Sequence, residues 1–343
     1  MKHLEKQIEA FFSEKIIHNL AVRIGKGDDR IYENYYSDER AINEKTRFDM
    51  ASVSKVLATT TISLMALEAG KIHLEDRVLD YFAGPDDKQE MTIQHLLTHT
   101  MAIGHTLLNI PGNNNENIPE YILGLPCAER IGTRVRYSCL GFILLGRILE
   151  KVYGKRLDVL FQEMVAVPLG MSDTRYCPEN KENLVQHNLD DGLLGVVNDR
   201  NCRYLDGVAG NAGIFSNMAD MTKFVSMLRR NGAPLFSREI LDLASRNYTA
   251  GLGEGRGLGF LYVDENYAQT GGLFPNGSIG HCGHTGQSFF LHRESGLYVI
   301  LLTDATISTV KKYGEKNYYE KVKLLREKIH AAIKMDLQEK GMI

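Results

Sequence analysis

Ser52 and Lys55 are the residues of this 343-residue chain whose types and spacing most directly suggest chemistry. Side chains three positions apart share one face of a helix, so the hydroxyl and the amine can meet. A serine hydroxyl becomes a good nucleophile only when a neighbouring base takes its proton. A partly desolvated lysine can lose its charge and act as that base. The pair predicts a serine nucleophile at a helix start, whereas Ser54 lies on a different helix face and is the weaker candidate.

The segment 136–141 offers a second proton carrier. It places Tyr137 at a predicted junction between a loop and a helix. A phenol near a cationic lysine can shift toward phenolate and move protons. The alternative is that Tyr137 is an aromatic residue that only packs.

The segment 281–288 is predicted to begin a strand near the end of the chain. In it, Thr285 and Gly286 would let the backbone approach a substrate closely. The amide of Gln287 would then lie where a substrate oxyanion could be held. The amide of Ser52, at its helix start, is the natural second donor, so we expect these two amides to form an oxyanion hole.

The order S-x-x-K, then Y-S-x, then H-T-G resembles the penicillin-recognising serine hydrolases, and most of all their class C β-lactamase, esterase and D-peptidase branch. The segments 96–100 (LLTHT), 137–146 and 207–216 also match phrases of that branch, and the resemblance covers about residues 5 to 335. It implies that Ser52 is the acylated nucleophile and that Lys55 and Tyr137 share the general-base and general-acid work. Which of the two takes the first proton stays open. His284, at the K/H position of the third motif, would support Tyr137 or contact the acyl side of the substrate.

Two departures from the family pattern concern the substrate. Cys139 stands where the family usually has an asparagine that binds a substrate amide carbonyl, and a thiol does this poorly. His284 replaces a lysine, and a largely neutral imidazole grips a carboxylate weakly. Both changes favour an esterase or peptidase that acts on a small-molecule ester, amide or peptide over an efficient β-lactamase. The competing hypothesis is a catalytically weak protein that binds penicillin or peptidoglycan fragments. No metal and no cofactor is implied.

Other polar residues near these motifs have simpler explanations. His99 is expected to hold the loop after its helix, and His281 to be structural. Asn198, Asp199 and Asn211 could line the cleft or form turns.

The elements that must position these residues indicate an α/β (α+β) fold. Strands predicted at 20–24, 31–35, 257–263, 278–282, 287–292 and 297–303 would form one central antiparallel sheet, built from both chain ends and flanked by helices. Residues 1–71 and 196–343 would make the sheet domain, and 72–195 an inserted, mainly helical domain. The active-site cleft is expected between the two.

The predicted helices are 4–18, 52–69, 74–82, 92–100, 140–152, 157–164, 218–230, 238–246 and 313–336, while 104–135 is predicted as loop and 176–207 as irregular. The charged side of the last helix is expected to face solvent over the sheet.

Composition limits the partners. A net charge of −3 gives no reason to expect nucleic acid or an acidic membrane surface. The five cysteines are scattered, which fits neither a zinc site nor a disulfide framework and indicates a reducing compartment. Without an apolar signal core or membrane-spanning segment, a cytoplasmic location is expected. The sequence indicates no oligomeric state.

Overall fold

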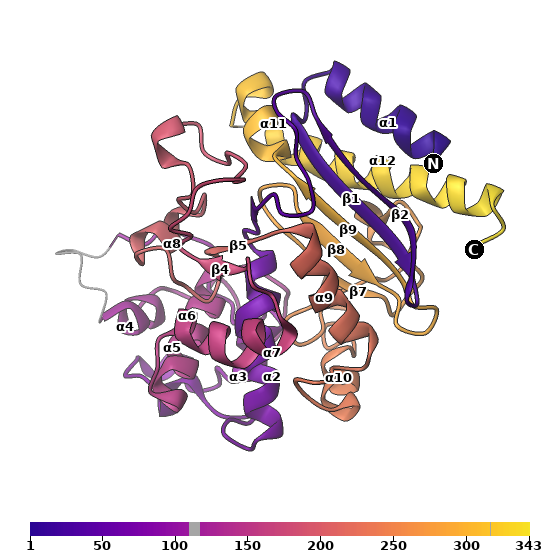
Figure 1. Ribbon diagram of the computed structural model, residues 1–343. Helices are drawn as coiled ribbons and strands as arrows, with labels where there is room; N and C mark the ends of the chain where they lie inside the picture. Colours follow the sequence, from indigo (N-terminus) through magenta and orange to yellow (C-terminus); the bar gives the residue numbers. More distant parts are fainter. Residues whose placement is uncertain (110–116, 316) are drawn as a thin grey trace.

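The two ends of the chain meet in one six-stranded antiparallel sheet (Figure 1). In this computed structural model, which describes residues 1–109, 117–315 and 317–343, the strand order is β2-β1-β9-β8-β7-β6. The strands are β1 (Asn19–Lys26), β2 (Asp29–Ser37), β6 (Leu261–Tyr262), β7 (Ile279–Cys282), β8 (Ser288–Leu291) and β9 (Leu297–Thr303). β1 pairs with β9 so that Leu20 lies opposite Thr303. The predicted fold class is therefore confirmed.

Alternate residues of β9 face two different hydrophobic layers, as the period of a strand requires. Val299 and Leu301 pack with the terminal helices α1 (Lys2–Ser13) and α12 (Tyr318–Glu339). Ile300 and Leu302 point to the other face, into the core that also includes residues of α9 (Met218–Arg229). Figure 1 shows α1 and α12 side by side over the first of these faces.

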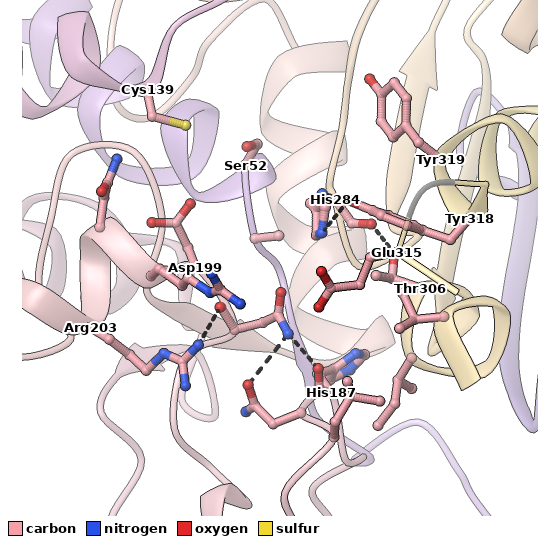
Figure 2. Close-up of a pocket in the computed structure, with 18 of the residues that line it drawn as sticks. Ser52, Cys139, His187, Asp199, Arg203, His284, Thr306, Glu315, Tyr318 and Tyr319 are labelled. Carbon is pink, nitrogen blue, oxygen red and sulfur yellow. Dashed lines mark hydrogen bonds between the residues drawn. The ribbon is translucent and has the colours of Figure 1, made fainter. Parts of the chain in front are cut away.

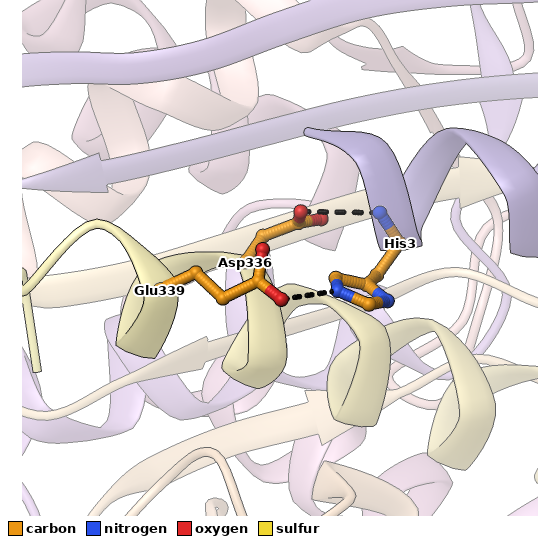
Figure 3. A group of neighbouring side chains, drawn as sticks. All are labelled: His3, Asp336 and Glu339. Atoms are coloured by element: carbon orange, nitrogen blue, oxygen red, sulfur yellow. Dashed lines mark hydrogen bonds and ion pairs between the residues drawn. The ribbon is translucent and has the colours of Figure 1, made fainter.

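The start of α1 is held by a carboxylate from α12 (Figure 3). Both oxygens of Asp336 accept hydrogen bonds from α1 amides, those of His3 (3.1 Å) and Leu4 (2.9 Å). The His3 ring contacts Glu339 at 2.7 Å. Within the described residues this is the one group of histidine and carboxylate side chains close enough together to hold a metal. Because Asp336 already caps α1, the group serves to join the two terminal helices.

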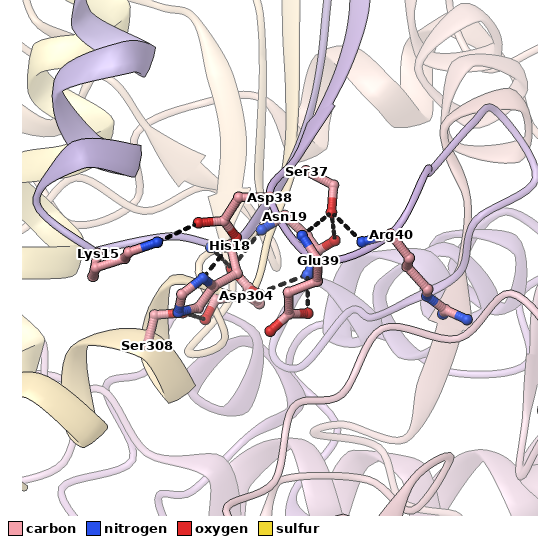
Figure 4. Close-up of polar contacts among 9 residues, drawn as sticks. All are labelled: Lys15, His18, Asn19, Ser37, Asp38, Glu39, Arg40, Asp304 and Ser308. Carbon is pink, nitrogen blue, oxygen red and sulfur yellow. Dashed lines mark hydrogen bonds and ion pairs between the residues drawn. The ribbon is translucent and has the colours of Figure 1, made fainter.

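A buried carboxylate also joins the start of β1 to α11 (Ala305–Tyr313) (Figure 4). Asp304 lies at the N-cap position of α11 and accepts hydrogen bonds from the amides of His18 (3.0 Å) and Asn19 (3.1 Å) and from the Asn19 side chain (3.0 Å). Burial raises the pKa of Asp304, although these donors oppose the shift.

Helices and a small second sheet fill the rest of the molecule. The helices are α2 (Thr61–Glu68), α3 (Ile93–Leu97), α4 (Ile118–Leu123), α5 (Cys139–Tyr153), α6 (Leu157–Phe161), α7 (Val167–Leu169), α8 (Arg200–Tyr204) and α10 (Arg238–Ala244); the sheet has the order β3 (Phe48–Asp49), β5 (Ile214–Ser216), β4 (Arg175–Tyr176). One hydrophobic cluster runs from these helices to the inner face of the large sheet. The division at residues 71/72 and 195/196 stays a prediction.

Several predicted elements are shorter than expected. The helix predicted at 74–82 is only one 3₁₀ turn, Val78–Asp80, and the Asp80 side chain caps its start by accepting from the Arg77 amide at 3.2 Å. The strand predicted at 257–263 is reduced to β6. There Gly259 has a left-handed φ of +78°, which interrupts an extended chain.

Other elements were missed. α4 begins at Ile118 inside the predicted loop 104–135, of which 110–116 lie outside the described residues. α8 lies within the segment 176–207 that was predicted as irregular, and β4 lies at its edge. The last helix, α12, begins at Tyr318 and not at 313, and the missed helix α11 precedes it. None of the described helices is long and apolar enough to cross a membrane.

Candidate active site

Ser52 lies in a tight turn between β3 and the helix that continues into α2. The residue before it, Ala51, has a left-handed φ of +44°, and its amide donates to the Asp49 side chain at 2.8 Å. A left-handed non-glycine residue is strained, and the carboxylate helps to hold it. The turn sets the Ser52 amide at the helix start, where it is free of intrahelical bonds. The Ser54 hydroxyl instead accepts a hydrogen bond from the Ile214 amide at 3.1 Å and is fully buried.

Lys55 is fully buried and has three hydrogen-bond acceptors for its terminal nitrogen. Nζ lies 3.0 Å from Ser52 Oγ, 2.9 Å from the Asn211 carbonyl and 3.5 Å from Cys139 Sγ. Three acceptors match the three donors of an ammonium group. Burial on its own would lower the pKa of Lys55, but the neighbouring thiol and phenol raise it above its usual value.

Tyr137 approaches Ser52 from the opposite chain segment, directly before α5. Its hydroxyl donates to Ser52 Oγ at 2.7 Å. The centroid of its ring lies 4.5 Å from that of His99, and the ring also contacts the guanidinium carbon of Arg256 at 5.4 Å and Lys55 Nζ at 5.2 Å. Burial raises the pKa of Tyr137, and the charge of Lys55 opposes that shift. Ser52, Lys55 and Tyr137 therefore converge within hydrogen-bond distance.

His99 fixes the loop that carries Tyr137. Its carbonyl accepts from the Arg136 amide at 2.8 Å, and its Nδ1 accepts from the Ser138 amide at 3.4 Å. Complete burial lowers the pKa of His99 well below its usual value, so the ring is neutral. His99 is thus structural, as expected, but the loop that it holds is the one before α5 and not only the loop after its own helix. His281 is also buried, and its Nδ1 lies 2.9 Å from the Cys282 carbonyl.

The turn between β7 and β8 packs on the segment before Ser52. The Thr285 hydroxyl and the Gln287 side-chain amide both donate to the Asp49 carbonyl, at 2.8 and 2.7 Å. Gly286 has a φ of +112°, and a Cβ there would collide with Thr303 of β9. The side chain of Thr285 thus binds the nucleophile turn, and Gly286 is needed for packing; neither residue lines the cavity beside Ser52.

The backbone of the same turn offers an unused donor. Among the hydrogen bonds between described residues, none is donated by the amides of Ser52 or Gln287, although the amides of Val53 and Gly286 are engaged. Gly283 touches the Met50 carbonyl closely, since a Cβ at position 283 would lie 2.8 Å from it. Two amides without an acceptor, on segments that touch, are candidate donors for an oxyanion hole.

A cavity of about 690 Å³ opens beside Ser52 (Figure 2). Figure 2 shows Ser52 between one wall with Cys139, Asp199 and Arg203 and another with His284 and Tyr318. His284 contacts the Tyr318 hydroxyl at 3.1 Å, and its carbonyl accepts from Thr306. The surrounding walls desolvate the imidazole and lower its pKa.

Cys139 lines the cavity together with Asn198 and Asp199, for which the sequence had left open either lining the cleft or forming turns. The Asp199 carboxylate accepts from the Asn211 side chain at 3.0 Å, which fixes the peptide whose carbonyl binds Lys55. His105 also lines the cavity, and a hydrogen bond to Cys139 raises its pKa. The only sequence signal for Asp199 and Asn211 was their position in loops that resemble those of the family.

Arg256 and Arg326 were missed as well. Arg256 stacks on Tyr137, and Arg326 of α12 lies buried behind the β7–β8 turn, where its guanidinium bonds the carbonyls of Gly283, Gly286 and Gln287. For Arg326 a signal existed: it follows Leu325 and precedes Ile329 by three positions, on the apolar face of the helix. The expectation that the charged residues of this helix face solvent is therefore wrong for Arg326.

Curated relatives cover most of the chain. It is 26% identical to an N-acetylmuramyl-L-alanine amidase of Bacillus subtilis, over 88% of this chain and 79% of that protein. It is 27% identical to a putative D-alanyl-D-alanine carboxypeptidase of Escherichia coli, over 77% of this chain and 70% of that protein. Esterase EstB of Burkholderia gladioli is also 27% identical, over 77% of this chain and 79% of the esterase.

Solved structures share the fold. The hydrolase EstCE1, described as having promiscuous acyltransferase activity, superimposes with a TM-score of 0.74 at 21% identity, over 96% of this chain and 98% of the other. The octameric penicillin-binding protein homologue of Pyrococcus abyssi gives a TM-score of 0.72 at 21% identity, over 89% of this chain and 73% of the other. The Beta-lactamase family model matches residues 4–319. The chain is therefore a hydrolase that belongs to the Beta-lactamase family.

Proposed function

We propose that this chain is a serine hydrolase that cleaves small apolar esters through an acyl-enzyme on Ser52. The observation that carries the proposal is the convergence of Lys55 Nζ (3.0 Å) and the Tyr137 hydroxyl (2.7 Å) on Ser52 Oγ. A nucleophile within hydrogen-bond reach of two proton carriers is the arrangement that covalent catalysis needs. The amides of Ser52 and Gln287 would hold the oxyanion.

The hydrogen bonds of Lys55 favour Tyr137 as the group that takes the first proton. An ammonium fills all three acceptors around Nζ, so Lys55 stays charged, and its charge opposes the rise in the Tyr137 pKa that burial causes. Tyr137 first gives up its own proton to solvent, and Ser52 Oγ then attacks the ester carbonyl while its proton moves to the Tyr137 phenolate oxygen. The C–O bond breaks, and the alcohol leaves with that proton. Water repeats the sequence in reverse to free the acid and Ser52.

The rim of the cavity supports an ester with an apolar group as substrate. Leu107, Leu189 and Tyr319 line the cavity yet are 46%, 56% and 48% exposed, so they form an apolar rim. At the third-motif position, His284 offers a neutral imidazole in contact with Tyr318. An apolar acyl or alkyl group fits this rim better than a charged peptide terminus does.

The test is labelling by a fluorophosphonate, read by intact mass, together with turnover of p-nitrophenyl esters of two to eight carbons. We expect one adduct on the wild type, none on Ser52→Ala and a normal adduct on Ser54→Ala. An equal adduct on Ser52→Ala would refute the proposed nucleophile.

Cys139 in the tyrosine motif motivates the second candidate, a protein that binds acyl compounds without turnover. Burst kinetics separate the two functions. One equivalent of p-nitrophenol without further release would favour the binding protein, whereas sustained release is expected for the esterase.

A cytoplasmic location is part of the proposal. It is supported by five cysteines that are all free thiols, since disulfide-poor chains are typical of reducing compartments.

A further inference from the structure

We propose that Arg326 is a positioning residue for acyl transfer, which it supports by aiming the Gln287 amide at the oxyanion. The inference rests on the proposed function, because it assigns a task in the same reaction. Arg326 lies on α12, 2% exposed, and does not line the cavity beside Ser52. It therefore acts through the β7–β8 turn and not on the substrate.

The guanidinium of Arg326 binds the backbone of one turn at three points. Nε donates to the Gly286 carbonyl at 3.3 Å, and Nη2 donates to the carbonyls of Gln287 (3.3 Å) and Gly283. Nη1 donates to the Gln269 side chain at 2.9 Å. All four hydrogen bonds go to neutral oxygens, and no described carboxylate forms an ion pair with Arg326. A buried charge without a counter-ion is costly, so a role beyond packing is expected for it.

The geometry of the peptide bond links this clamp to the chemistry. The Gly286 carbonyl and the Gln287 amide belong to one planar trans peptide, so they point in opposite directions. A guanidinium that holds the carbonyl from behind therefore turns the N–H away from α12. On that other side the turn packs on the segment before Ser52: Gly283 lies against the Met50 carbonyl, and Gln287 Nε2 bonds the Asp49 carbonyl at 2.7 Å.

The charge of Arg326 also makes the amide a better donor. A hydrogen bond to a carbonyl polarises the peptide and strengthens the bond that its N–H can make. A fixed positive charge behind the turn further stabilises negative charge that develops on the substrate oxygen. Both effects grow as the tetrahedral intermediate forms, so they should change kcat more than KM.

The experiment compares four variants with the wild type. Arg326→Met keeps the length and removes the charge; Arg326→Lys keeps the charge and loses the planar fork. Gln269→Leu removes the one acceptor outside the turn, and Leu325→Ala weakens the packing of the same helix. Each is measured for kcat and KM on a p-nitrophenyl ester, for the rate of fluorophosphonate labelling, and for its thermal midpoint.

We expect Arg326→Met to lower kcat/KM and the labelling rate by about 10²-fold, the size of a lost oxyanion donor, with KM within about threefold. Arg326→Lys should lose about tenfold. Gln269→Leu should stay within about twofold, and Leu325→Ala should lower the thermal midpoint without changing kcat per folded molecule. If Arg326→Met does not fold, Arg326→Lys decides the question.

The outcomes separate the two proposals. If wild-type protein is not labelled, or is labelled equally in Ser52→Ala, the proposed function is wrong and the role of Arg326 falls with it. If the wild type turns over and both Arg326 variants keep its kcat at a lowered thermal midpoint, Arg326 is only structural and the inference alone is overturned.

Discussion

At the scale of single residues, Lys55 is the group on which the proposed chemistry depends most. It is fully buried, and its nitrogen links the nucleophile to Cys139 and to the Asn211 carbonyl. We expect Lys55→Ala to lower kcat/KM on p-nitrophenyl acetate by about 10²- to 10⁴-fold, because without the lysine charge Tyr137 cannot act as the base, and a general base usually contributes that much. Steady-state kinetics on protein of confirmed fold make the measurement.

Lys88 provides the matched control for Lys55. Its side chain is also only 1% exposed, it pairs with Asp87 at 2.5 Å, and it does not line the cavity. Lys88→Ala should lower stability and leave kcat unchanged. If both lysine variants lost activity equally, the loss would be a general effect of removing a buried lysine.

Cys139 is expected to control the choice between esters and amides. It lines the cavity with its thiol 3.5 Å from Lys55 Nζ, and a thiol bonds an amide carbonyl poorly. Cys139→Asn would supply a carboxamide donor, and one added hydrogen bond corresponds to about tenfold in rate. Nitrocefin turnover should therefore rise about tenfold relative to ester turnover. Cys139→Ser, with a hydroxyl of similar size, is the control and should leave that ratio within about threefold of the wild type.

At the scale of elements, the turn between β3 and the following helix contains a titrating group. Asp49 is fully buried, and burial raises its pKa to about 6, although the amides of Ala51 and Asn198 bind its two oxygens and oppose the shift. Protonation turns one of these oxygens into a hydroxyl, which is a weaker acceptor than a carboxylate oxygen. We expect kcat/KM to fall as pH drops through about 6, because the strained residue before Ser52 is then released. A pH–rate profile of the wild type against Asp49→Ser tests this, since the variant should lack that limb.

Stability should follow pH in the opposite direction over the same window. The folded state holds the Asp49 proton more tightly than the unfolded chain, whose pKa is near 3.8. Asp49 therefore contributes on the order of 3 kcal/mol to the free energy of unfolding below about pH 4. This contribution is lost as the pH rises through about 6. The difference between wild type and Asp49→Ser in urea unfolding at pH 4 and pH 8 measures it. An unchanged difference would mean that Asp49 does not titrate in this range.

The junction of β1 with α11 should be strongly stabilised by the hydrogen bonds of Asp304. Asp304 accepts three hydrogen bonds there (Figure 4), and the helix that follows carries Thr306, which bonds the His284 carbonyl. Asp304→Ala leaves buried donors without acceptors, which costs about 1–3 kcal/mol each when unmet. We expect a loss of about 2–4 kcal/mol in urea unfolding. As a control, Asp38→Ala removes only surface contacts to His18 and Lys15 and should cost less than about 1 kcal/mol.

At the scale of the whole molecule, the sequence predicted those features of the fold and of the candidate site that follow from the spacing of apolar residues and from the order of the motifs. The convergence of Ser52, Lys55 and Tyr137 was predicted from spacing, motif order and the family resemblance, and the sheet built from both chain ends was predicted from the alternation of apolar residues. α11 and the contacts of Arg256 and Arg326 were not, because they depend on which segments meet in space. Thr285 shows the same limit: its place in the motif was clear, but its contact with the Asp49 carbonyl comes from tertiary packing.

The pairing of both chain ends has a consequence for how the protein is made. Asp49 and Gln287, which bond across the proposed oxyanion hole, are 238 positions apart. At a synthesis rate of about 5–20 residues per second, Ser52 leaves the ribosome roughly 10 to 50 s before the turn that would complete its site. During that interval the second amide is missing, although Tyr137, 85 positions after Ser52, emerges in its first half. We therefore expect the nascent chain to react poorly with esters until β7, β8 and α12 are in place.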